Sequence, residues 1–156
     1  MLIDLRSLCN KYKFLPKGII HVGAHKGEEL TTYEDLGIEN VIWIEANPKI
    51  FESLNENIKK FKNHKAYNFL VSDKNDEEYI FHVTNNGESS SILELERHKI
   101  HHSHIHVVED IVLKSKKMDF NVTVVVFKSE FLIECKDSKK ILVFAILSKA
   151  NSKFIN

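Results

Sequence analysis

Short apolar runs alternate with amphipathic segments along the first half of the chain. Apolar runs at residues 19–22 and 41–45 predict buried strands, and residues 66–71 predict a third. The first run follows the turn-forming residues Pro16 and Gly18, which mark its start. Strands with so little polar alternation are typical of a sheet that is covered on both faces.

Helical spacing fills the two intervals between these strands. The first predicted helix carries Leu30, Tyr33 and Leu36 on one face and ends at Gly37. The second has Asn47 as its N-cap and Pro48 as its first residue. Its apolar positions recur at three- and four-residue steps, as expected of an amphipathic helix: Phe51, Leu54, Ile58 and Phe61.

The order strand, helix, strand, helix, strand predicts an α/β fold with a Rossmann-like, doubly wound parallel sheet over residues 15–72. We expect residues 1–156 to form a single domain, because a chain of 156 residues suits one compact unit.

The second half of the chain is less regular. Residues 78–83 predict a strand, residues 85–91 a polar loop, and residues 105–113 another strand. Further on, residues 122–127 and 141–147 are rich in strand-forming residues, but no clear helix separates them. Because parallel neighbours need crossover connections, we expect the C-terminal part of the sheet to be incomplete or degenerate.

A glycine-bearing turn, Gly23-Ala-His-Lys-Gly27, joins the first strand to the first helix. A dinucleotide site at this place would need Gly-x-Gly-x-x-Gly. Here His25 stands at the position of the second glycine, and Glu28 and Glu29 would repel a phosphate. The turn therefore favours a ligand with a cationic centre and no phosphate, such as S-adenosylmethionine, over a nicotinamide cofactor. A plain tight turn with close helix packing is the structural alternative.

Two carboxylates follow the predicted strands. Glu45 ends the second strand, where a carboxylate can accept both ribose hydroxyls of an adenosine; the alternative is a solvated charge. Asp73 lies just past the third strand, where it could accept from the adenine amine. The alternative for Asp73 is a turn formed with Ser72.

Four segments stand out in sequence order. They are Ile20-His-Val-Gly-Ala-His-Lys-Gly-Glu-Glu29, Val41-Ile-Trp-Ile-Glu-Ala-Asn-Pro48, Val71-Ser-Asp73 and Asn86-Gly-Glu-Ser-Ser-Ser-Ile-Leu93. With these segments in this order, the chain resembles the FkbM-type methyltransferases over residues 14–119. Those enzymes use S-adenosylmethionine, have a Rossmann-like fold and mostly methylate hydroxyl groups, often on sugars or natural products.

The resemblance implies a cofactor site but assigns no catalytic residue. Gly23 and its neighbours would cradle the methionine, Glu45 would hold the ribose, and Asp73 would lie near the adenine. Residues 89–91 would line the active-site side, with a capping or turn loop as the alternative. The implied cofactor-binding residues are His21, Gly23, Ala24, His25, Gly27, Glu45, Ala46, Asn47, Ser72 and Asp73.

The chain departs from the family pattern at two places. His21 stands where the family usually has an acid, so the methionine ammonium loses one expected partner. The late Ile-Asp-x-x-Gly-x-Glu motif is missing, and residues 131–135 are only a faint echo of it. We therefore expect residues 120–156 to be an atypical tail, similar to a truncated or frame-shifted one, and catalysis to be weak or absent.

Five histidines gather between residues 98 and 106, and three interpretations of them are open. They could form an exposed interaction surface, bind a metal, or supply a general base for an acceptor hydroxyl. We expect no metal, because no Glu-x-x-His pattern accompanies them and the two cysteines are remote in sequence. The five are His98, His101, His102, His104 and His106.

The charge balance and hydropathy of the chain indicate which classes of partner it can bind. The chain has 22 basic and 22 acidic residues and no net charge, so we expect no nucleic-acid partner. The sequence offers neither a secretory signal nor an apolar run long enough for a membrane span, so we expect no membrane partner and a cytoplasmic location. The acceptor is expected to be a small molecule or carbohydrate, and the oligomeric state is open.

Three functions therefore compete at the level of sequence. The first is S-adenosylmethionine-dependent O-methylation of a hydroxyl. The second is a degenerate, inactive methyltransferase-like binding module, which the missing late motif favours. The third is a nicotinamide-dependent oxidoreductase, which His25 and Glu28 disfavour.

Overall fold

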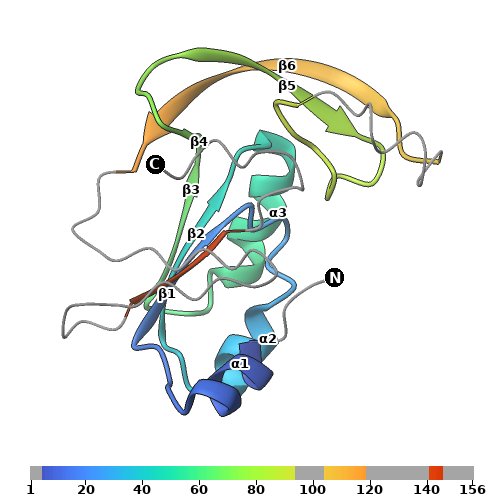
Figure 1. Ribbon diagram of the computed structural model, residues 1–156. Coiled ribbons are helices and arrows are strands. Elements are labelled where there is room, and N and C mark those ends of the chain that lie inside the picture. The colour runs from blue at the N-terminus through green and yellow to red at the C-terminus, as the bar shows by residue number, and fades with distance from the viewer. Residues whose placement is uncertain (1–4, 94–103, 119–140, 146–156) are drawn as a thin grey trace.

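A four-stranded parallel sheet forms the centre of the molecule (Figure 1). The computed structural model describes residues 5–93, 104–118 and 141–145. The strand order is β3-β2-β1-β7. The mixed α/β class with a parallel sheet is thereby confirmed. The strands are β1 (Gly18–Val22), β2 (Asn40–Glu45), β3 (His64–Asn68) and β7 (Ile141–Ala145).

Three helices share one hydrophobic core against this sheet. They are α1 (Leu5–Tyr12), α2 (Leu30–Asp35) and α3 (Pro48–Ile58). Trp43 of β2 lies at the centre of this core with no exposed surface. Since each helix contributes to the same core, the three cover one face of the sheet. Within the described ranges, the second helical layer of a doubly wound sheet is not present.

The other face of the sheet carries a smaller core. Ile20 and Ile44 are buried there, with Phe69 and Val71 packed against them. Because strand residues alternate between faces, β1 places Ile19 and His21 toward the helices and Ile20 toward this second core.

A second sheet lies above the ends of β1 and β2 in Figure 1, where β5 and β6 form a long curved pair. Its order is β4-β6-β5, with β4 parallel and β5 antiparallel to β6. Its core contains Leu70 and Phe81. The strands are β4 (Leu70–Ser72), β5 (Glu78–Thr84) and β6 (Val107–Lys117).

Most local predictions are confirmed, and one is wrong. Residues 66–71 do not form one strand: β3 ends at Asn68, and β4 begins at Leu70 in the other sheet. The sequence stays apolar across the break between β3 and β4 because Leu70 is buried in the core of the second sheet. The last strand is described over residues 141–145, whereas residues 122–127 lie outside the described residues.

α1 was not predicted, although its two inward residues, Leu5 and Cys9, are buried. None of the helices in the described part of the chain combines the length and apolar character that a bilayer crossing requires.

Candidate functional site

The glycine turn between β1 and α2 is fastened to the neighbouring strand. Gly23 and Ala24 both donate their backbone N–H to the carbonyl of Ile44, at 2.9 and 3.0 Å. Gly27 has φ +82°, and a Cβ there would lie 3.0 Å from Leu54 Cδ1. A side chain at this position would therefore be strained and would press on α3. The turn lies at the carboxyl ends of β1 and β2, the edge where parallel sheets bind ligands.

Glu45 connects this turn to the one after β2. Its Oε2 accepts the backbone N–H of His25 at 2.8 Å, and its Oε1 accepts that of Asn47 at 2.8 Å. The side chain is buried, with 7% of the residue exposed. Burial raises the pKa of Glu45, and the backbone N–H bonds oppose that rise. The carboxylate thus holds both strand ends together, and Glu45 is not the solvated charge that the sequence left open.

The His25 side chain lies between an acidic residue and the loop after β5. Its Nδ1 is 2.6 Å from Glu28 Oε1. A Cβ on Gly87, whose φ is +74°, would lie 2.9 Å from His25 Nε2, so a side chain at this position would be strained and would press on the ring. His25 itself has φ +46°, a left-handed conformation that costs energy for a residue with a side chain. Apart from a glycine in a polar loop, no feature of the sequence indicated this contact.

Acidic side chains surround the turn. Burial raises the pKa of Glu29, and the negative charges of Glu28 and Glu88 raise it further. Burial also acts on Glu28, but the hydrogen bond with His25 reverses its effect, and the net pKa of Glu28 is lowered. The turn therefore carries an excess of negative charge, which favours a cationic ligand over an anionic one.

His21 lies in the helix-side core, away from solvent. It is 0% exposed, its ring stacks on Trp43 with centroids 5.3 Å apart, and its Nδ1 is 3.0 Å from the Tyr33 hydroxyl. Burial lowers the pKa of His21 to about 4, so the ring is neutral at pH 7. The His21 side chain therefore belongs to the core, and its expected part in the cofactor site stays a prediction.

The other predicted site residues divide into two groups. Ala24 and Asn47 are buried, and the Asn47 side chain caps α3 by accepting the N–H groups of Lys49 and Ile50 at 3.0 and 3.4 Å. Ser72 and Asp73 lie at the end of β4, which pairs with β6 in the second sheet. Their positions are therefore set by the second sheet, whereas Glu45 lies at the edge of the first.

The Ser72 hydroxyl forms a turn with Lys74, whose N–H it accepts at 3.1 Å and whose carbonyl it contacts at 3.0 Å. This turn spans Asp73, for which a turn formed with Ser72 was the structural alternative. The three loop serines also bond locally: Ser90 Oγ accepts the Thr84 N–H at 3.0 Å, Ser91 Oγ accepts the Leu93 N–H at 3.1 Å, and Ser89 pairs with Asn86. These contacts shape the loop that brings Gly87 to His25.

Two of the five clustered histidines, His104 and His106, fall within the described residues; the other three lie outside them. His106 Nδ1 is 3.3 Å from the His104 carbonyl. Among the residues that the structure describes, no three His, Cys, Asp or Glu side chains are grouped so that they could hold a metal ion.

Comparisons with known proteins add little to this geometry. No family model matches the chain, and no curated protein matches it. Among solved structures, a "putative RNA methyltransferase" from Pyrococcus horikoshii is similar at 24% identity and a TM-score of 0.36, over 42% of this chain and 34% of that one. The chain thus spans about a third of that protein, and a likeness this weak carries no argument about activity.

Proposed function

We propose that this domain binds S-adenosylmethionine at the glycine turn and Glu45, in a Rossmann-like sheet of the methyltransferase type. The observation that carries the proposal is the 2.8 Å bond from the His25 N–H to Glu45 Oε2, which joins the two strand ends at the ligand-binding edge. The activity we assign is transfer of a methyl group to a hydroxyl of a sugar or other small molecule.

The charges at the turn suit this cofactor. S-adenosylmethionine has a sulfonium and an ammonium group but no phosphate, and Glu28, Glu29 and Glu88 make the turn negative. A dinucleotide would place its pyrophosphate in the same negative region. The charge pattern therefore supports the methyl donor over a nicotinamide cofactor.

Glu45 would hold the ribose. Each carboxylate oxygen has two lone pairs, and the bonds to His25 and Asn47 use one on each oxygen. The remaining lone pairs can accept the two ribose hydroxyls. Because the backbone bonds fix the carboxylate before any ligand arrives, little side-chain entropy is lost on binding.

The bound cofactor supplies an activated methyl group on a sulfonium. The chain contributes orientation, since methyl transfer needs the acceptor oxygen in line with the methyl group. The backbone bonds from Gly23 and Ala24 to the Ile44 carbonyl hold the turn against β2.

A degenerate module that binds the cofactor without turnover is the second candidate. Buried His21 stands where the resembled family has an acid, so the ammonium would lack that partner. Incubation with radiolabelled donor and a panel of sugars, alcohols and phenols separates the two candidates. Binding with turnover supports the enzyme, and binding without turnover supports the module.

The proposal itself is tested by thermal unfolding with S-adenosylmethionine, S-adenosylhomocysteine or NAD. At one hundred times the dissociation constant, a ligand adds about 2.7 kcal/mol of stability. We expect both methyl-donor forms to raise the Tm and NAD to leave it unchanged. Calorimetry should show weaker binding for Glu45→Gln than for Asp73→Asn. Equal responses to NAD, or no response to either donor form, would contradict the proposal.

A further inference from the structure

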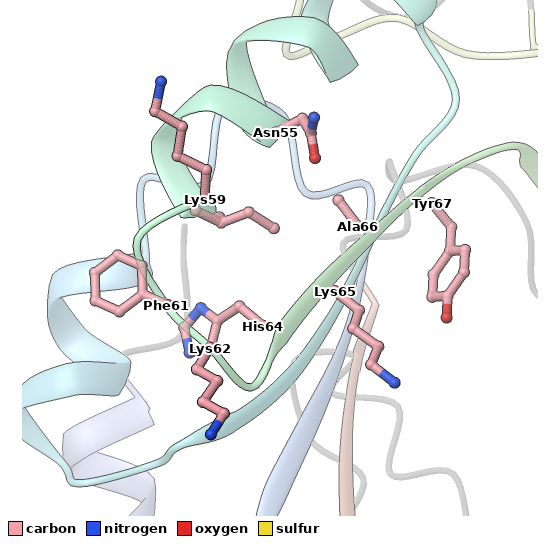
Figure 2. Close-up of a pocket in the computed structure, with 9 residues that line it drawn as sticks. Asn55, Lys59, Phe61, Lys62, His64, Lys65, Ala66 and Tyr67 are labelled. Carbon is pink, nitrogen blue, oxygen red and sulfur yellow. The ribbon is translucent and has the colours of Figure 1, made fainter.

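A cavity of about 420 Å³ lies between α3 and the outer strand β3, away from the glycine turn (Figure 2). Its volume is in the range of sites that bind small molecules. α3 contributes Asn55 and Ile58, its C-cap contributes Lys59, and the segment from Phe61 to Tyr67 forms the rest of the lining. β3 is the last strand on this side of its sheet, so the cavity opens at the sheet edge.

The lining of the cavity is mixed, with apolar side chains beside a pair of stacked rings and polar groups around them. Ile58 is only 3% exposed, and Ala66 lies across the cavity from the helix in Figure 2. The His64 ring stacks on Phe61 with centroids 4.9 Å apart. An apolar floor beside stacked rings suits the flat face of an organic molecule.

The hydrogen bond between Trp43 and His64 fixes the tautomer of the histidine. Trp43 Nε1 donates to His64 Nδ1 at 3.3 Å, and an indole nitrogen can only donate. Nδ1 is therefore the acceptor, and in the neutral ring Nε2 carries the proton. Burial lowers the pKa of His64, which favours this neutral form. His64 thus offers the cavity a hydrogen-bond donor.

Lysines surround the opening. In Figure 2 the side chains of Lys59, Lys62 and Lys65 extend from the edge of the cavity in different directions. Lys59 pairs with Glu56, but no carboxylate among the described residues pairs with Lys62 or Lys65. Residues 59–65 contain four lysines and no acid, although the whole chain has no net charge. Positive charge is therefore concentrated at this opening.

We propose that this cavity binds an organic phosphate of mononucleotide size. Its planar part would lie on the Ile58 and Ala66 floor, and its phosphate would lie at the opening, where the exposed, flexible side chains of Lys62 and Lys65 can turn toward it. Lysine ammonium groups suit a phosphate as mobile point charges. The limited volume of the cavity favours a small molecule over a polymer. This site is separate from the proposed methyl-donor site and does not depend on it.

The experiment titrates adenosine monophosphate into the ¹⁵N-labelled full chain and follows the backbone amide signals. We expect saturable shifts in residues 58–67, and at least tenfold weaker binding of adenosine or inorganic phosphate alone. The double variant Lys62→Gln/Lys65→Gln should lose at least tenfold in affinity. The control Lys114→Gln/Lys116→Gln makes the same charge change at two exposed positions on β6 and should bind normally. Thermal unfolding of each variant checks that it is folded.

Three results would overturn the proposal. Shifts that leave residues 58–67 unaffected would place the ligand elsewhere. An equal loss in the β6 control would mean that binding reflects overall charge alone. Binding of a single-stranded oligonucleotide without binding of the mononucleotide would make the surface a nucleic-acid contact instead.

Discussion

At the scale of single residues, Glu45 has a structural role that can be separated from any role in binding. Its carboxylate accepts two backbone N–H groups at 2.8 Å and is 7% exposed. Truncation would leave those two donors unpaired at a buried position. Asp73 is exposed and provides a matched carboxylate without these bonds.

We predict that Glu45→Ala lowers the free energy of unfolding by about 2–4 kcal/mol, because each unpaired buried donor costs about 1–3 kcal/mol. Asp73→Ala should change it by less than about 0.5 kcal/mol, as expected at an exposed site. Urea denaturation measures both. Equal losses in the two variants would show that the Glu45 bonds do not stabilise the fold.

Burial of His21 makes the free energy of unfolding depend on pH. Its pKa is about 4 in the folded chain and 6.5 in the reference state. Above pH 6.5 the ring is neutral in both states. Between these values the unfolded chain binds a proton that the folded chain does not, so stability falls as the pH falls. Below pH 4 both states are protonated and this contribution stops changing.

We therefore predict that His21→Gln, which cannot titrate, has a flatter dependence of unfolding free energy on pH between about 4 and 6.5. Between these pH values, the slope of unfolding free energy against pH should be smaller in the variant than in the parent chain. The difference should approach about 1.4 kcal/mol per pH unit, the most that one proton can contribute. Urea denaturation of both proteins at half-unit pH steps gives the difference. Parallel curves for the variant and the parent chain would contradict the assigned pKa.

At the scale of elements, α3 depends on its N-cap residue, Asn47. Asn47 accepts two N–H groups of the first helical turn, and Pro48 occupies the first helical position. We predict that Asn47→Ala costs about 1 kcal/mol of stability, whereas Asn47→Ser retains most of it because serine also caps well. Chemical denaturation followed by circular dichroism compares the two. A serine variant as unstable as the alanine variant would mean that packing of the amide dominates.

The signals that predicted α3 are local, and this explains which elements the sequence could indicate. Asn47, Pro48 and the spacing of Leu54 and Ile58 depend only on near neighbours, so β1, α2, β2 and α3 were predictable. The break at Phe69 was not, because both halves of that run are apolar and only the choice of partner strand differs.

The candidate site shows the same limit. The glycine turn and Glu45 stand out in the sequence, since their residue types and spacing are local. The burial of His21 and the approach of Gly87 to His25 depend on packing between distant segments. The cavity beside β3 was missed because its lysines also have an ordinary explanation, as charges at a helix end and on an outer strand.

At the scale of the whole molecule, the two sheets differ in how well they are covered. β1 has strand partners on both sides, and Ile19 and Ile20 are buried on opposite faces. In the second sheet, Ile80 and its cross-strand partner Val112 are 57% and 65% exposed. Regions with little buried apolar surface open more readily.

We predict that the β5–β6 pair opens before the parallel sheet. In native-state hydrogen exchange, amides of residues 19–22 should exchange only through global unfolding, with a strong dependence on urea. Amides of β5 should exchange faster and with a weaker dependence on urea, because a smaller surface is exposed. Identical exchange in the two regions would show that the molecule opens as a single unit.

The pairing of β1 with β7 has a consequence for how the chain is made. Gly18 pairs with Ile141, more than a hundred positions later, so β7 leaves the ribosome long after β1, β2 and β3. Until β7 has been synthesised, one edge of β1 has no strand partner. An unpaired parallel edge can pair with another nascent chain on the same messenger. The nascent chain is therefore exposed to aggregation between the synthesis of β1 and that of β7, and slower translation after β3 would lengthen that period.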